Sequence, residues 1–293
     1  MSPRLNIIGG GKVAQALGGL LVRQGGVGWA AVCSRTLLSA ERSARCIGSA
    51  SAVGGIEELP SAELWMVSVP DREISKVAVA LAERSAVKPG DVVFHVSGAH
   101  TAEELKALRQ RGALLGSLHP VRSIADPAVA ISQFEGTVCA IEGDEEAAQQ
   151  LAQLVRRIGG VALQVPPAAK LLCHAGHVFA SNYLVAVLDA ARQLYEAAGV
   201  PPEAISAFFS SIARGALENV SILGTTAALT GPVARGEVEL VRDQVAAIDA
   251  RAPELSGLYC ALGLHAAGIA ARRGEVSEER LDALRRICLR QGA

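Results

Sequence analysis

The chain has 293 residues and a formal net charge of −1 at pH 7; half of its residues are hydrophobic and 19% are charged. The high hydrophobic fraction and the low net charge exclude an intrinsically disordered chain. The balance of 28 basic against 29 acidic residues argues against a nucleic-acid-binding protein, and the length predicts one large or two ordinary domains.

Short apolar runs alternate with helical patterns through the first half of the chain. This alternation is typical of βαβ units and predicts an α/β domain with a mostly parallel, doubly wound sheet of the Rossmann type. The predicted strands are 5–8, 29–33, 64–69, 92–96, 114–118, 137–141 and 161–165. The predicted helices between them are 13–23, 75–85, 102–111 and 145–158.

The pattern changes after the Pro166–Pro167 pair, because no convincing strand follows it. Helical periodicity instead predicts an all-α region. Its helices are predicted at 168–198, from Pro202 onward, and at 239–248, 256–272 and 277–291. We therefore expect two domains, an α/β domain over residues 1–166 and an all-helical domain over residues 167–293.

The longest apolar run, 171–188, raises the question of a membrane helix. It contains His174, His177, Ser181 and Asn182, which are costly in lipid, so a buried helix of a soluble protein and no membrane contact are expected. The six cysteines form no C-x-x-C pair and are predicted to be buried free thiols. The N-terminus shows no secretory signal, and a cytoplasmic location is expected.

A glycine-rich loop lies between the first predicted strand and the first predicted helix. Gly9, Gly11 and Ala14 fit the pattern G-x-G-x-x-G/A, in which the glycines allow a tight turn and a close backbone approach to a pyrophosphate. The helix start at Lys12 and Val13 would offer free N–H groups to the phosphates. Dinucleotide binding is favoured over a glycine turn without a ligand. A different nucleotide or S-adenosylmethionine is a weaker alternative.

The end of the second strand favours NADP over NAD. Ser34, Arg35 and Thr36 stand where an NAD enzyme places an acidic residue on the ribose hydroxyls. Hydroxyls and a guanidinium suit a 2′-phosphate, which a carboxylate would repel. The alternative is a solvated arginine in a loop.

Three later strands end in polar residues, and the carboxyl ends of parallel strands are where ligands bind. Val69 and Pro70 end one strand and are expected to touch the cofactor. Ser97 and Gly98 follow the next strand, and they offer a hydroxyl and exposed backbone N–H groups. His119 follows the third strand as a proton carrier or substrate donor, although a lone histidine there is more often a satisfied structural residue.

Arg122, three residues after His119, could hold a substrate carboxylate. The long apolar helix carries Lys170 and His174 four residues apart, on one helical face, with Asn182 near the edge of the same polar stripe. A desolvated lysine can act as a general acid. The spacing equally allows a solvated lysine with core histidines. We expect no metal site.

The chain resembles the superfamily that includes 6-phosphogluconate and 3-hydroxyisobutyrate dehydrogenases, ketopantoate reductase and pyrroline-5-carboxylate reductase. It is most similar to a branch of oxidoreductase-like proteins whose C-terminal half is a domain of unknown function. The resemblance rests on the glycine loop and on five further runs. These are 68–71, 95–99, 116–121, 174–182 and the Thr-Gly-Pro-x-x-Arg-Gly run at 230–236.

The resemblance implies a Rossmann domain joined to a helical domain, and dimerisation through the helical domain. In several relatives the interdomain helix carries a lysine that moves a proton at the substrate oxygen, followed four residues later by asparagine. Lys170 occupies the lysine position, whereas His174 replaces the asparagine. The resemblance also suggests that Arg235 approaches the substrate.

These features predict an NADP-dependent oxidoreductase that reduces a small carbonyl compound, with a 2-keto acid similar to ketopantoate as the most concrete substrate. Lys170, assisted by His174, would supply the proton, and the substrate would lie between Ser97–Gly98, His119 and the long helix. Gly98, Arg122, Asn182 and Arg235 would contact the substrate. The alternative is a non-catalytic NADP-binding protein that uses the helical domain for a regulatory partner.

Overall fold

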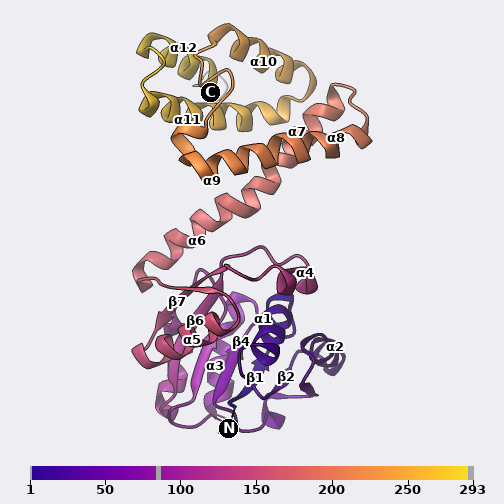
Figure 1. Cartoon of the computed structure of the whole chain (residues 1–293), viewed down its shortest axis with the longest axis vertical. Helices are drawn as coiled ribbons and strands as arrows, with labels where there is room; N and C mark the ends of the chain where they lie inside the picture. The colour runs from indigo at the N-terminus through magenta and orange to yellow at the C-terminus, as the bar shows by residue number, and fades with distance from the viewer. Residues whose placement is uncertain (1, 84–86, 290–293) are drawn as a thin grey trace. The chain divides into compact units, whose positions relative to one another are not determined.

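The computed structural model describes residues 2–83 and 87–289 (Figure 1). The chain forms two compact units, Met1–Ser181 and Asn182–Ala293. The change from strands to helices occurs near residue 166, as the sequence indicates, but the first compact unit continues to Ser181. The start of the long apolar helix is therefore part of the same unit as the sheet.

The first unit is built on one eight-stranded sheet with the order β3-β2-β1-β4-β5-β6-β7-β8. All neighbouring strands pair in parallel except β6 and β7, which are antiparallel. The predicted mostly parallel, doubly wound sheet is therefore confirmed. The strands are β1 (Arg4–Ile8), β2 (Trp29–Cys33), β3 (Ala50–Val53), β4 (Leu64–Val67), β5 (Val92–His95), β6 (Leu114–Pro120), β7 (Val138–Gly143) and β8 (Val161–Gln164).

Helices cover both faces of this sheet. The longer ones are α1 (Lys12–Arg23), α2 (Leu37–Ile47), α3 (Ile74–Glu83), the 3₁₀ helix η3 (Ala102–Arg111), α4 (Pro127–Ser132), α5 (Glu145–Arg157) and α6 (Lys170–Val178). Short 3₁₀ turns are η1 (Ile56–Glu58), η2 (Asp71–Glu73) and η4 (Pro167–Ala169).

Alternation along the strands divides the core into two layers. In β1, Leu5 and Ile7 pack in the layer that contains α1, α2 and α5, whereas Ile8 packs in the layer under α3 and η3. In β4, Met66 belongs to the first layer and Trp65 to the second. Successive side chains of a strand point to opposite faces, so an apolar run without alternation is what a sheet covered on both sides requires.

The structure adds elements that the sequence patterns did not indicate. The helix α2 and the short strand β3 lie between the second and third predicted strands, and α4 follows β6. The predicted helix 102–111 is a 3₁₀ helix. The predicted helix 75–85 corresponds to α3, and its last two residues lie outside the described part of the chain.

The second unit is helical throughout its described residues, which confirms the predicted all-α region. Its elements are α7 (Leu184–Ala197), α8 (Pro202–Phe208), the π-helical segment η6 (Phe209–Ala213), α9 (Arg214–Ala228), α10 (Val238–Arg251), η7 (Pro253–Leu255), α11 (Ser256–Arg273) and α12 (Glu278–Leu289). The helix α9 was not predicted. The last two residues of the predicted helix 277–291 fall outside the described residues.

The long apolar helix differs from its prediction in two ways. It is interrupted by a π-helical segment, η5 (Phe179–Tyr183), and it is exposed where a buried helix was expected. Leu172 is 80% exposed and Phe179 is 70% exposed. The stretch Pro167–Ala197 is long and apolar enough, by length and composition, to cross a membrane. Apolar composition alone predicted burial, because it does not show which element would cover the helix.

The six cysteines are thiols that form no disulfide with one another. Four of them are buried, Cys46 is half-buried, and Cys173 on α6 is exposed. The prediction that these thiols are buried is therefore wrong for Cys173, for the same reason as for the helix that carries it.

Candidate functional site

A pocket of about 700 Å³ lies over the carboxyl ends of β1, β2 and β4. Its lining brings together six of the nine residues predicted to bind a cofactor. Those six are Gly9, Gly11, Ser34, Arg35, Val69 and Pro70. The position is the one at which open α/β sheets bind nucleotides.

The glycine loop has the conformation that its sequence predicts. Gly9 has φ = +104°, and a Cβ there would lie 2.1 Å from the backbone oxygen of Ser68. A Cβ at Gly11 would meet no atom of the described residues within 4 Å, so the backbone there is open to a ligand. Lys12 and Val13 begin α1, where free backbone N–H groups favour a phosphate.

The rim at the end of β2 is basic and rich in hydroxyls. Arg35 is exposed in the pocket, and the Ser34 hydroxyl donates to the Ser39 hydroxyl over 3.2 Å. Thr36 instead caps α2, because its side chain accepts from the backbone N–H of Ser39. Arg72, which the sequence patterns did not single out, adds a second guanidinium to the lining.

Lys170 lies in a buried polar network at the edge formed by β5, β6 and β7. Its side chain is only 3% exposed. The ammonium donates to the Ser97 carbonyl oxygen over 3.3 Å, to Glu142 Oε1 over 3.4 Å, and to the Ser117 hydroxyl in a short contact. Burial lowers the pKa of Lys170, and the Glu142 carboxylate opposes that shift. An ammonium has three donors, and all three are used here.

His95 is a fully buried, neutral imidazole that shapes the loop after β5. Its Nδ1 accepts from the backbone N–H of Ser97 over 3.1 Å, so its Nε2 carries the proton and donates to the Thr101 carbonyl over 2.9 Å. Burial lowers the pKa of His95 to about 4. The Ser97 hydroxyl accepts from the N–H groups of Ala99 and His100, which completes the turn.

His119 is also neutral, because burial lowers its pKa to about 4. Its Nδ1 lies 3.2 Å from the Val96 carbonyl oxygen, an atom that can only accept a hydrogen bond. The proton therefore resides on Nδ1, and Nε2 presents a lone pair. In this tautomer His119 is a hydrogen-bond acceptor, whereas the sequence predicted a proton carrier or donor.

Three imidazoles gather beside the Lys170 network. The ring centroid of His119 lies 6.0 Å from that of His174 and 5.7 Å from that of His177. Gly98 lies against this cluster, because a Cβ there would be 2.6 Å from His174 and 2.8 Å from His119 Nε2. A side chain at position 98 would therefore force these imidazoles to shift.

In the loop after β5, His100 is bracketed by two carboxylates. Its Nδ1 lies 3.2 Å from Glu104 Oε1, and its Nε2 lies 3.7 Å from Asp71 Oδ2. Across residues 2–83 and 87–289, no group of three or more His, Cys, Asp or Glu side chains has a geometry that could hold a metal ion.

Two of the predicted substrate contacts, Arg122 and Arg235, are bonded to neighbouring side chains. The Arg122 guanidinium binds the backbone and side-chain oxygens of Gln133, each over 2.7 Å. Arg235 forms a two-point ion pair with Glu237. Arg235 and Asn182 both belong to the second unit.

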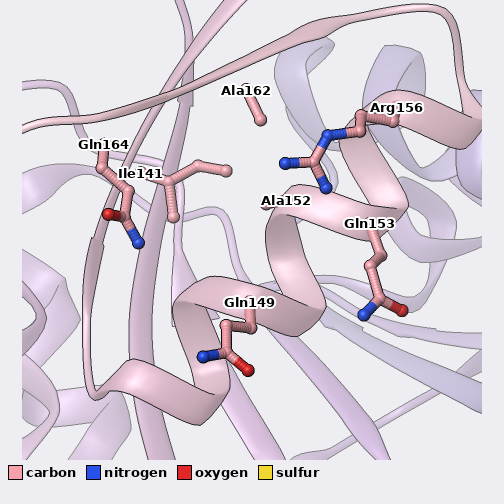
Figure 2. A pocket seen from close by; sticks show the side chains of 7 residues that line it. All are labelled: Ile141, Gln149, Ala152, Gln153, Arg156, Ala162 and Gln164. Carbon is pink, nitrogen blue, oxygen red and sulfur yellow. The ribbon is translucent and has the colours of Figure 1, made fainter.

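A further hollow lies between α5 and the β7–β8 edge of the sheet. It has a volume of about 330 Å³, and Figure 2 shows the side chains that line it. Gln149, Gln153, Gln164 and Arg156 supply its polar groups. It shares no lining residue with the glycine-loop pocket.

The sequence patterns missed Glu142 and Ser117, the two buried side chains that hold the Lys170 ammonium. Glu142 lies within a turn-like Glu-Gly-Asp run that marked the end of a strand, and Ser117 lies in the middle of β6. The register places them directly opposite each other. Only the antiparallel pairing of β6 and β7, which the sequence does not indicate, brings them together.

Two known domains match the chain. Residues 2–120 match a Rossmann-like domain, and residues 137–266 match DUF2520, a domain of unknown function. The chain therefore joins a Rossmann-like domain to a DUF2520 domain. This confirms the resemblance drawn from the motifs. No curated protein matches the chain.

The similarity to solved structures covers nearly the whole chain. The protein TM1727 from Thermotoga maritima has a TM-score of 0.66 and 23% identity, over 99% of this chain and 100% of that one. An imine reductase from Myxococcus stipitatus in complex with NADP⁺ has a TM-score of 0.67 and 17% identity, over 96% and 99%. A reductive aminase from Aspergillus terreus in complex with NADPH and ethyl-5-oxohexanoate has a TM-score of 0.58 and 18% identity, over 99% and 93%. At these identities the likeness shows the shared fold.

The buried His95 predicts a loss of stability in acid. In the unfolded chain a histidine gains its proton near pH 6.5, whereas His95 in the fold does so only at about pH 4. The unfolded state therefore binds more protons between these values, and the free energy of unfolding should fall by about 3 kcal/mol from pH 7 to pH 4 on account of this group.

Urea unfolding at several pH values measures this effect. The His95→Gln variant should be less stable at pH 7, yet should lose less stability on acidification than the wild type. His265→Gln, at an exposed position on α11, is the matched control and should keep the wild-type slope. If the unfolding free energy of His95→Gln changed with pH as steeply as that of the wild type, His95 would not be the source of the acid sensitivity.

Proposed function

We propose that this protein is an NADP-dependent oxidoreductase that reduces a small carbonyl or imine compound. The observation that carries the proposal is the placement of two features on one sheet. The glycine-loop pocket lies over β1, β2 and β4, and the buried Lys170 network lies over the adjoining β5 and β6. A hydride transfer needs a nucleotide site beside a proton source, and the pocket and the Lys170 network would supply these two parts.

The pocket fits NADP on the chemistry of its lining. The Gly9 turn and the open Gly11 backbone would hold the pyrophosphate at the start of α1, together with the N–H groups of Lys12 and Val13. Arg35 and Ser34 would hold the 2′-phosphate, with Thr36 positioning the loop as the cap of α2. Val69 and Pro70 would line the path toward the substrate. The bound nucleotide supplies the hydride.

Lys170 is the proposed general acid. Burial makes its ammonium more acidic than an exposed lysine, which suits proton delivery to a developing alkoxide. Because its three donors are occupied, a substrate oxygen must take the place of one present acceptor. Among these acceptors, the Ser97 carbonyl lies on the loop that also carries Gly98, beside His119 and His174.

The proposed substrate is a small 2-keto acid similar to ketopantoate, and this choice rests on the family resemblance at Lys170. Arg122, Asn182 and Arg235 are the proposed carboxylate and substrate contacts. Arg122 would then exchange its Gln133 partner for the substrate, and Arg235 would exchange Glu237. Imines belong in the same test, because two of the structures that share the fold are named an imine reductase and a reductive aminase.

Turnover tests the role of Lys170. Purified protein with NADPH and a panel of 2-keto acids and cyclic imines is followed by the loss of NADPH absorbance. Lys170→Met should lower kcat by about 10²- to 10⁴-fold, because the proton donor is lost. It should keep NADPH binding, because Lys170 does not line the glycine-loop pocket. Lys106→Met, at an exposed position on η3, is the matched control.

NADPH binding without turnover of any compound in the panel would instead favour the alternative, a non-catalytic NADP-binding protein. In that case Lys170→Met should leave nucleotide affinity unchanged, and the variant could lose only its binding to a partner protein.

Cofactor preference tests the basic rim. Calorimetry should show tighter binding of NADPH than of NADH, and Arg35→Ala should weaken NADPH by about 10- to 100-fold, the loss expected for a hydrogen bond to a charged group, with little effect on NADH. Arg42→Ala, exposed on α2 and away from the pocket lining, is the control. Equal affinities of the wild type for NADPH and NADH would refute the preference.

The proposed assembly is a homodimer through the helical unit. Large apolar side chains of this unit are exposed, among them Ile222 at 79%, Val185 at 67% and Ile212 at 63%. Exposed apolar side chains in such number are typical of an association surface.

Light scattering should give twice the mass of the chain for the wild type. Ile222→Glu should give the single-chain mass, whereas Val79→Glu on α3 should leave the dimer intact.

A further inference from the structure

Glu142 is a buried carboxylate to which the proposed reaction has so far given no role. It lies near the end of β7, is 6% exposed, and faces Ser117 across the β6–β7 pair. A carboxylate removed from water is costly unless it is paired and hydrogen-bonded. Its position therefore needs a compensating partner.

One oxygen of Glu142 receives two donors from different parts of the first unit. Oε1 accepts from the backbone N–H of Ala102 over 2.6 Å and from the Lys170 ammonium over 3.4 Å. Ala102 begins η3 and Lys170 begins α6, so the carboxylate joins β7 to the starts of two helices. The contact with Ala102 fixes the carboxylate independently of the lysine.

We propose that Glu142 is a positioning residue that holds Lys170 protonated and in place at the Ser97–Ser117 edge. The inference rests on the proposed role of Lys170 as the acid. Glu142 itself does not touch the substrate. It acts through the ammonium, by fixing one of the three N–H directions and by keeping the charge on the lysine.

The charges that face Lys170 single out Glu142. The groups are Glu142 from β7, Asp71 from η2, His95 from β5 and His119 from β6. The two histidines are neutral at pH 7 because burial lowers both of their pKa values to about 4. Asp71 acts only through space, whereas Glu142 makes a hydrogen-bonded ion pair.

The direction of the effect follows from these contacts. Burial lowers the pKa of Lys170, and Glu142 raises it again. A neutral amide at position 142 leaves the burial effect unopposed. The pKa of Lys170 must then fall, and the fraction of protein with a protonated acid at neutral pH must fall with it.

NMR titration of lysine side chains tests this directly. The chain contains five lysines, so the Lys170 signal is identified by its absence from Lys170→Arg. In Glu142→Gln the pKa of Lys170 should fall by about 1 to 3 pH units relative to the wild type. The amide oxygen can still accept from Ala102, which keeps the local fold. Glu145→Gln, three residues further along the chain and bonded to Gln149 instead of Lys170, is the matched control and should leave that pKa unchanged.

An unchanged Lys170 pKa in Glu142→Gln would overturn the proposal, even if the variant were less stable, because it would show a purely structural role. Glu142→Asp supplies the second variant. It retains the charge on a shorter side chain, and it should restore the Lys170 pKa at least in part. The assignment would also be refuted if Glu142→Asp did not restore the Lys170 pKa and the control variant Glu145→Gln shifted it.

Activity provides the second readout. In Glu142→Gln the alkaline limb of kcat/KM should move to lower pH by the same amount as the Lys170 pKa, with NADPH affinity unchanged. The NMR titration needs neither cofactor nor substrate. A protein without turnover would therefore refute the proposed function, while the Glu142–Lys170 coupling would still be decided.

Discussion

The candidate site depends on the hydrogen bonds that hold the buried ammonium of Lys170. A positive charge removed from water needs a counter-charge and a complete set of acceptors. Glu142 on β7, Ser117 on β6 and the Ser97 carbonyl on the loop after β5 provide them. These hydrogen bonds connect three elements: the loop after β5, the antiparallel strand β7 and the start of α6. The loop conformation also places Gly98 against the imidazoles of His119 and His174.

Much of the fold could be predicted because it follows from periodicity. Each strand of the first unit that was predicted exists, and the glycine loop has the required turn. The elements that were missed are β3, α2, α4 and α9. The strand β3 has only four residues, Ala-Ser-Ala-Val, with a weak apolar signal. The exposure of the long apolar helix was not predictable, since burial depends on what covers a helix rather than on its own composition.

The candidate site was predictable where a residue type has one dominant chemical use. Gly9, Gly11 and Arg35 were predicted from their residue types to bind a nucleotide, and they line the same pocket. The contacts of other predicted residues depend on hydrogen bonds that the sequence does not indicate. Thr36 caps a helix, Arg122 binds Gln133, and the bond to Val96 makes His119 an acceptor. Glu142 gave no signal, because its importance comes from a strand pairing between distant residues.

The reversal of β7 also bears on the order in which the chain can fold. Strands β1 to β6 complete a parallel sheet from the first 120 residues, whereas β7 must turn back before it can pair with β6. A carboxylate that enters the interior without a counter-charge is costly. When β7 docks, Glu142 enters the interior with its counter-charge still 28 residues ahead in the chain. We therefore expect a growing chain to complete the sheet only once Lys170 has been synthesised and has reached its place.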